Sequence, residues 1–132
     1  MKAWVASLLL GGSQLSFAVP ADLLEGPHRE VELVGVVGTR PFVLHGRVED
    51  GTVLKLLAPI DLTFPGHPDE LKNVLDIVLH AWSDPALHEM GRLNGKLVRV
   101  QCVVAPDSFL GYRHASCSPR SIEVLPTTFK PN

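Results

Sequence analysis

Apolar and polar residues alternate along most of the chain, and this pattern predicts a series of strands. The alternation is strongest over residues 96–104, and further apolar, β-branched runs cover residues 30–37, 42–48, 53–57 and 116–124. Because the side chains of a strand alternate between its two faces, each run can bury one face. In the strongest run, three residues share one face (Val98, Val100 and Cys102) and four share the other (Leu97, Arg99, Gln101 and Val103).

Turn and capping residues divide these runs. Asp50-Gly51 lies between two apolar runs, which is typical of a tight turn and predicts a β-hairpin there. Further along, Asp84 can cap a helix, Pro85 suits the first helical position, and Asn94-Gly95 can end it. These signals predict one short helix at residues 85–92.

The segment at residues 71–82 fits two structures. A helix face would contain Leu71, Val74, Leu75, Val78 and Trp82, whereas a strand face would contain Leu75, Ile77, Leu79 and Ala81. We favour the strand, because the clearer helix signal follows immediately. The chain is then mainly β, with one short helix before the penultimate strand and a closing hairpin. This order predicts a small OB-like Greek-key barrel over residues 30–125; the alternative is an α+β domain with a helix at 71–82.

The first 18 residues have the features of an export signal. Met1-Lys2 gives a positive start, residues 3–10 are almost wholly apolar, and Ser16-Phe17-Ala18 places small residues where a signal peptidase reads. We therefore predict cleavage after Ala18, with Ala21 as the second choice; a buried N-terminal helix is the alternative. The apolar run is too short to span a bilayer. We expect a soluble mature chain, periplasmic or secreted, with an irregular lead-in at 19–29 and a polar tail at 126–132.

Charge narrows the choice of partner. Removal of residues 1–18 leaves 114 residues with a formal charge of −3, because Lys2 is the one charged residue that is lost. The basic residues are scattered singly, with no cluster that could neutralise phosphates. Nucleic acid and a membrane surface are therefore poor candidate partners.

Cys102 and Cys117 are the only cysteines. An exported chain with an even number of cysteines is expected to oxidise them to a disulfide. If the two cysteines face each other across a strand pair, the turn centres between Phe109 and Leu110. The loop at residues 105–114 is then too long for a tight hairpin, and the disulfide holds its base. Stabilisation of a small domain is the simpler role of such a bridge.

Several segments resemble a family of small exported bacterial domains of unknown function. They are VELVG at 31–35, VLKLLAPI at 53–60, LNGKLVRV at 93–100 and the loop at 111–115. The resemblance implies an OB-type barrel with a Gly-His-His-His-Thr style loop before its last strand. This chain keeps only Gly111 and His114 of that loop, so a metal role does not carry over. In size, export and loop the chain is also similar to periplasmic immunity proteins that neutralise type VI amidase effectors.

The predicted function is therefore that of a non-enzymatic, exported protein-binding module, such as an inhibitor or immunity protein. Its candidate contact residues lie in the disulfide-bounded loop: Phe109, Leu110, Tyr112, Arg113 and His114. Aromatic anchors and arginine dominate the binding energy of many interfaces. No His-Glu-x-x-His, Cys-x-x-Cys or Gly-x-Ser-x-Gly motif occurs in the mature chain, and we expect neither catalysis nor a cofactor. The alternative is a barrel that binds a small ligand or a metal through its histidines.

Overall fold

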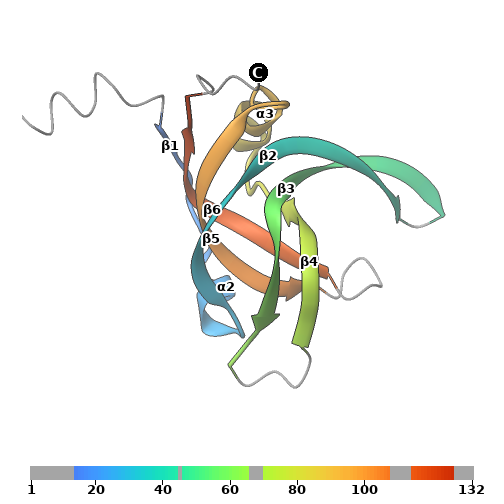
Figure 1. Ribbon diagram of the computed structural model, residues 1–132, viewed down its shortest axis with the longest axis vertical. Helices are drawn as coiled ribbons and strands as arrows, with labels where there is room; N and C mark the ends of the chain where they lie inside the picture. Colours follow the sequence, from blue (N-terminus) through green and yellow to red (C-terminus); the bar gives the residue numbers. More distant parts are fainter. Residues whose placement is uncertain (1–13, 45, 66–69, 108–113, 127–132) are drawn as a thin grey trace, which may run out of the picture.

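The structure, a computed structural model, describes residues 14–44, 46–65, 70–107 and 114–126 (Figure 1). Two thirds of the described residues are in strands, so the predicted mainly β fold is confirmed. Two short helices accompany the strands in this part of the chain. In chain order the elements are β1 (Gln14–Ser16), α2 (Ala21–Glu25), β2 (Arg29–Leu44), β3 (Arg47–Thr63), β4 (Glu70–Leu79), α3 (Asp84–Gly91), β5 (Leu97–Asp107) and β6 (His114–Val124).

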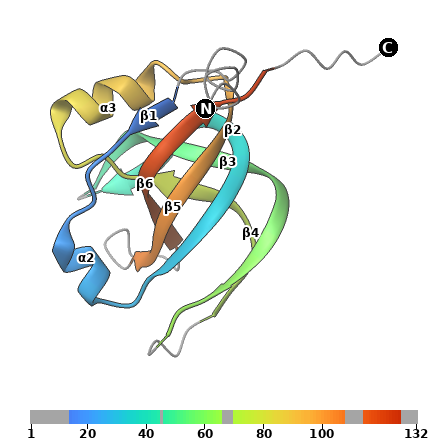
Figure 2. The same cartoon turned by 90° about the vertical axis from the view of Figure 1, so that its left-hand side faces the viewer.

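The strands form one sheet that curls into a ring. Their order is β1-β6-β4-β3-β2-β5, and an additional pairing of β6 with β5 closes the ring (Figure 2). All pairings are antiparallel except that of β4 with β6, which is parallel and joins only Val78 to Ser116 and Leu79 to Cys117. The five long strands and the helix between the third and fourth of them have the connectivity expected of an OB-like fold.

The core fills the interior of this ring. It contains the inward-facing side chains of β2 to β6, of which Leu54, Ile77, Val98, Val100 and Ile122 are fully buried. Helix α3 lies at one end of the ring (Figure 1) and adds Met90, which is also fully buried. Burial of each such side chain stabilises the fold by roughly 1.5–3 kcal/mol.

The local signals for α3 and β4 are largely correct. Helix α3 begins one residue earlier than predicted, because the hydroxyl of Ser83, not Asp84, caps it by accepting the N–H of Ala86 at 3.2 Å. Gly95 follows the helix with a φ of 84°, which glycine adopts at low cost. The alternative helix at 71–82 is wrong, since most of that segment is the strand β4. The predicted lead-in contains the five-residue helix α2.

The predicted hairpin at Asp50-Gly51 is wrong. β2 and β3 run on together to the pair Leu44–Arg47, so the turn contains Gly46, whose φ is 76°. Gly51 serves a different purpose, because a Cβ atom there would lie 2.9 Å from the ring of Phe42. The glycine gives the buried aromatic ring its space. The two strands therefore form a long arm that extends away from the ring (Figure 1).

The predicted disulfide is present, and Cys102 and Cys117 are joined with an S–S distance of 2.09 Å. The predicted turn position assumed that the two residues lie directly opposite each other, and they do not. Cys102 pairs with Pro119 and Cys117 pairs with Val104, so the two cysteines are offset by two residues along the strands. The bridge therefore runs diagonally between β5 and β6, inside the core. Neither α2 nor α3, the helices of the described residues, has the length and apolar character that a membrane crossing needs.

Candidate functional site

The strands at the base of the predicted loop are longer than expected. β5 continues to Asp107 and β6 begins at His114, so both ends of the segment predicted as loop at 105–114 are strand. Phe109, Leu110, Tyr112 and Arg113 lie outside the described residues. The structure therefore shows how β5 and β6 hold the loop, and the five predicted contact residues remain a prediction.

A hollow lies beside this base. We call it the β4 groove, and it has a volume of about 410 Å³. Seven consecutive residues of β4, Glu70 to Asp76, form its length, while Arg40 comes from the arm and Ala115 from β6. The groove exists because the end of β4 and the start of β6 pair at two residue pairs only. Along the earlier residues of β4, the ring is open.

The outer edge of β4 is free along the groove. On its inner edge, β4 pairs with β3 from Glu70 to Val78. On its outer edge, no described strand pairs with residues 70–77. An edge strand of this kind presents backbone N–H and C=O groups that a further strand can pair with. The groove is therefore lined by a row of hydrogen-bonding groups as well as by side chains.

Leu75 is an apolar side chain of the groove that stays exposed. It is 52% exposed, whereas Val74 before it packs against the core and Ile77 and Leu79 after it are buried. The core continues behind it with Leu71, which is buried and also lines the groove. An exposed leucine in the groove that the described part of the chain does not cover is a candidate anchor point for a partner side chain.

The backbone of β4 is distorted next to Leu75. Asn73 has a φ of 54°, and its N–H donates to the Oδ1 atom of Asp61 on β3 at 2.9 Å. The register between the two strands shifts on either side of Ile60: β3 has extra residues between Lys55 and Ile60, whereas β4 has one extra residue between Leu71 and Val74. Asparagine tolerates the left-handed region better than other side chains do. This irregularity bends the edge, and the side-chain to backbone bond fixes the bend.

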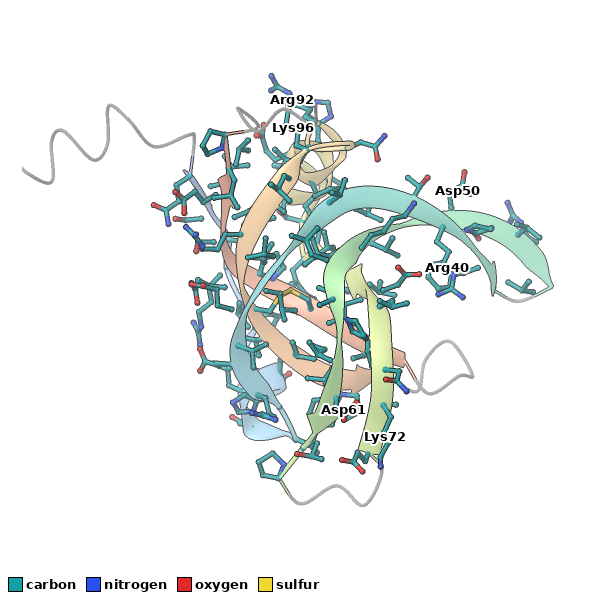
Figure 3. The ribbon with its side chains drawn as sticks, in the orientation of Figure 1. Arg40, Asp50, Asp61, Lys72, Arg92 and Lys96 are labelled. Atoms are coloured by element: carbon teal, nitrogen blue, oxygen red, sulfur yellow. A yellow bond between two sulfur atoms is a disulfide. The ribbon has the colours of Figure 1, made fainter. Side chains whose placement is uncertain are left out.

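Charged side chains form the rim of the groove. Arg40 Nη1 lies 3.4 Å from the Oδ2 atom of Asp76, and its guanidinium is 5.7 Å from the centre of the Phe42 ring. Figure 3 shows Arg40 between the arm and β4. Lys72 and Glu70 pair at 3.7 Å at the other end. These pairs are solvent-exposed and add little stability, so a partner can replace them at low cost.

The described histidines and acids give no sign of a metal centre or a catalytic cluster. No group of three or more His, Cys, Asp or Glu residues in the described ranges is placed to hold a metal ion. His80 and His88 are exposed, and His28 Nδ1 lies 2.9 Å from the carbonyl oxygen of Gly26. Among the described residues, the candidate functional features are therefore the groove and the strand edge of β4.

Sequence reasoning missed two features of this surface. The first is the β4 groove, which depends on strands that are distant in the sequence. The second is Trp82, which is 49% exposed although its Nε1 atom donates to the buried hydroxyl of Ser118 at 3.0 Å. Its ring centre lies 4.3 Å from that of His80. The position of Trp82 just before the capping Ser83 was the available signal.

Comparison with known proteins adds no assignment. No protein family, characterised protein or solved structure matches the chain. The function is therefore argued from the groove, the strand edges and the disulfide.

Proposed function

We propose that the protein is an exported, non-enzymatic protein-binding module whose partner docks at the β4 groove and the adjoining disulfide-bounded loop. The observation that carries this proposal is the outer edge of β4, which no described strand pairs with along residues 70–77, beside the exposed Leu75 that lines the groove. Backbone groups along a strand edge bind an extended segment, and neighbouring pockets select its side chains. The disulfide hints at an oxidising, exported environment.

The size of the groove suits an extended protein segment. Seven residues of edge strand are enough for a partner strand of ordinary length. The volume of about 410 Å³ is open along one side, so a chain can enter it laterally. Leu75 would contact an apolar side chain, while Arg40 and Lys72 would contact polar groups at the two ends.

The disulfide-bounded loop would supply the second part of the contact. β6 carries both Ala115, which lines the groove, and Cys117, which is bonded to β5. A bridge at the base of a loop reduces the conformational entropy that the loop loses on binding. The net negative charge of the mature chain suits a basic partner, because complementary fields raise the rate of encounter. An inhibitor or immunity protein of an exported enzyme has these properties.

A matched pair of leucine variants tests the proposal. Leu75, in the groove, is 52% exposed, and Leu87, on α3, is 53% exposed. We expect Leu75→Lys to weaken binding of the exported partner by about tenfold or more, because a buried leucine contact is lost and lysine opposes strand addition. Leu87→Lys should leave the affinity unchanged. Phe109→Ala tests the contribution of the loop in the same assay.

The assay is capture of exported proteins on the immobilised mature chain, followed by titration calorimetry with the captured protein. Melting temperatures of both variants close to that of the wild type would show that the fold is intact. Equal affinity of the two leucine variants for a stoichiometric partner would contradict the role of the groove. Stoichiometric zinc or copper after purification without chelator would instead favour the metal-binding alternative.

A further inference from the structure

The outer edge of β6 holds the last residues of the predicted export signal. β1 runs antiparallel to β6, with Gln14, Leu15 and Ser16 opposite Glu123, Ile122 and Ser121. The N–H of Phe17 extends the ladder by donating to the carbonyl oxygen of Arg120 at 2.9 Å. Figure 2 shows β1 lying along β6 next to α3.

The side chains of this segment alternate as those of a docked strand do. Leu15 and Phe17 pack against the core cluster, while Gln14 and Ser16 are exposed. Leu15 lies opposite Ile122, which is fully buried. Two apolar side chains, two residues apart, thus occupy one side of an extended peptide.

Two small cavities show the space around these side chains. One, of about 70 Å³, is lined by Phe17, Trp82 and Pro119 among others. The second, of about 250 Å³, lies between residues 15–18 and the first turn of α3. The segment therefore fits its surroundings incompletely, and bulkier side chains can be accommodated at both positions.

We infer that the outer edge of β6, from Arg120 to Glu123, is a docking site for an extended partner peptide with large apolar side chains two residues apart. Residues 14–18 of the uncleaved chain fill this site. Cleavage after Ala18 vacates it, exposing the backbone groups of β6 and uncovering Ile122. The inference rests on the export that we propose above. It concerns a different edge from the β4 groove, so the two sites can be tested separately.

The chemistry of the partner peptide follows from the segment that pairs with this edge in the structure. The pairing is antiparallel, the contact side is apolar at alternate positions, and the outward side carries small or amide side chains. Two exposed ion pairs border the edge, Arg120 with Glu30 at 2.7 Å and Arg99 with Glu123 at 3.0 Å. A peptide with two large apolar residues and short polar neighbours matches this arrangement in register and polarity.

The test uses the chain's own segment as the probe. A synthetic peptide of residues 13–19 is titrated into the exported mature protein, whose N-terminus is first established by intact mass. Trp82 reports binding, because it lines the same cavity as Phe17 and is the only tryptophan left once Trp4 is removed. We expect saturable binding, and about tenfold or greater weakening when the peptide carries serine in place of either Leu15 or Phe17. A peptide with Ser16→Gln should bind as the parent peptide does.

The uncleaved chain is the occupied control, and it should not bind the peptide. The Leu75→Lys variant of the mature protein should bind it normally, which separates failure of this site from failure of the β4 groove. Equal binding of the serine-substituted peptides, or the absence of saturable binding to the mature chain, would overturn the inference. So would a mature mass that still includes residues 14–18, or a stable dimer of the mature chain that excludes the peptide.

Discussion

The disulfide offers the most direct quantitative check of the fold. The bridge closes a loop between residues that are 15 apart in the sequence, and both cysteines are buried. In the chain-entropy description, a loop of this size stabilises the folded state by about 3 kcal/mol through the entropy of the unfolded chain. For a domain of about this length, that free energy corresponds to a loss of roughly 10–15 °C in melting temperature when the bridge is reduced.

The measurement compares melting curves by circular dichroism for oxidised protein and for protein refolded in the presence of a reductant. Reduction breaks the S–S bond but removes no side-chain atoms, so it leaves no cavity that would add to the change in stability. The Cys102→Ala/Cys117→Ala variant serves as the control, because its melting temperature should not respond to the reductant. A difference below about 3 °C between oxidised and reduced wild type would refute the reasoning. An equal response of the alanine variant would show that the reductant acts elsewhere.

Three further predictions follow from the packing and the ion pairs. Gly35→Ala should lower the free energy of unfolding by about 3 kcal/mol, since a Cβ atom would overlap the carbonyl group of Lys55, whereas Gly91→Ala, with open space around it, should cause almost no loss; urea unfolding compares the two. The hydrogen bond from Arg120, and then its charge, hold the pKa of Glu30 below its usual range. The stability that this pair contributes is therefore present above the unfolded pKa and is lost as pH falls through the folded pKa. Glu30→Gln should therefore flatten the acid limb of melting temperature against pH, and an unchanged limb would contradict this. Ser118→Ala should cost about 1 kcal/mol and weaken the near-ultraviolet dichroism of the indole that donates to it, whereas an unaltered spectrum would argue against that bond.

Local signals in the sequence were sufficient for most of the secondary structure. The alternation at residues 96–104 predicts β5, and its buried face contains Val98, Val100 and Cys102 as expected. The proline and cap before α3 predict the helix to within a residue at each end. These features depend on neighbours in the chain, so one sequence contains them.

The position of the β2–β3 turn shows where local signals fail. Asp50-Gly51 suits a tight turn by its sequence, but the turn of the structure contains Gly46, five residues earlier. The Phe42 ring occupies the space where a side chain at Gly51 would lie, which gives this glycine a reason to stand within a strand. That contact joins different strands, so the local sequence did not reveal it.

The β4 groove could not be predicted for a related reason. Leu75 looks like any other inward-facing residue of an alternating strand, and its neighbours Ile77 and Leu79 are buried as the pattern requires. In the structure Val74 packs against the core instead, and the register between β3 and β4 shifts at this point. Neither this shift nor the two-residue pairing of β4 with β6 leaves a local trace in the sequence.

The position of β6 relates the two proposed docking edges to the disulfide. Its first half pairs with β4 through Ser116 and Cys117, and its second half pairs with β1 from Ser121 to Glu123. The register irregularity after Gln101 lies opposite the stretch between these two halves. The bond from Cys117 to β5 fixes β6 where the ring closes, so that a strand added to either edge meets a rigid template. Rigidity of this kind lowers the entropy lost on association, so in the proposed function the disulfide would contribute to recognition through the same geometry by which it stabilises the fold.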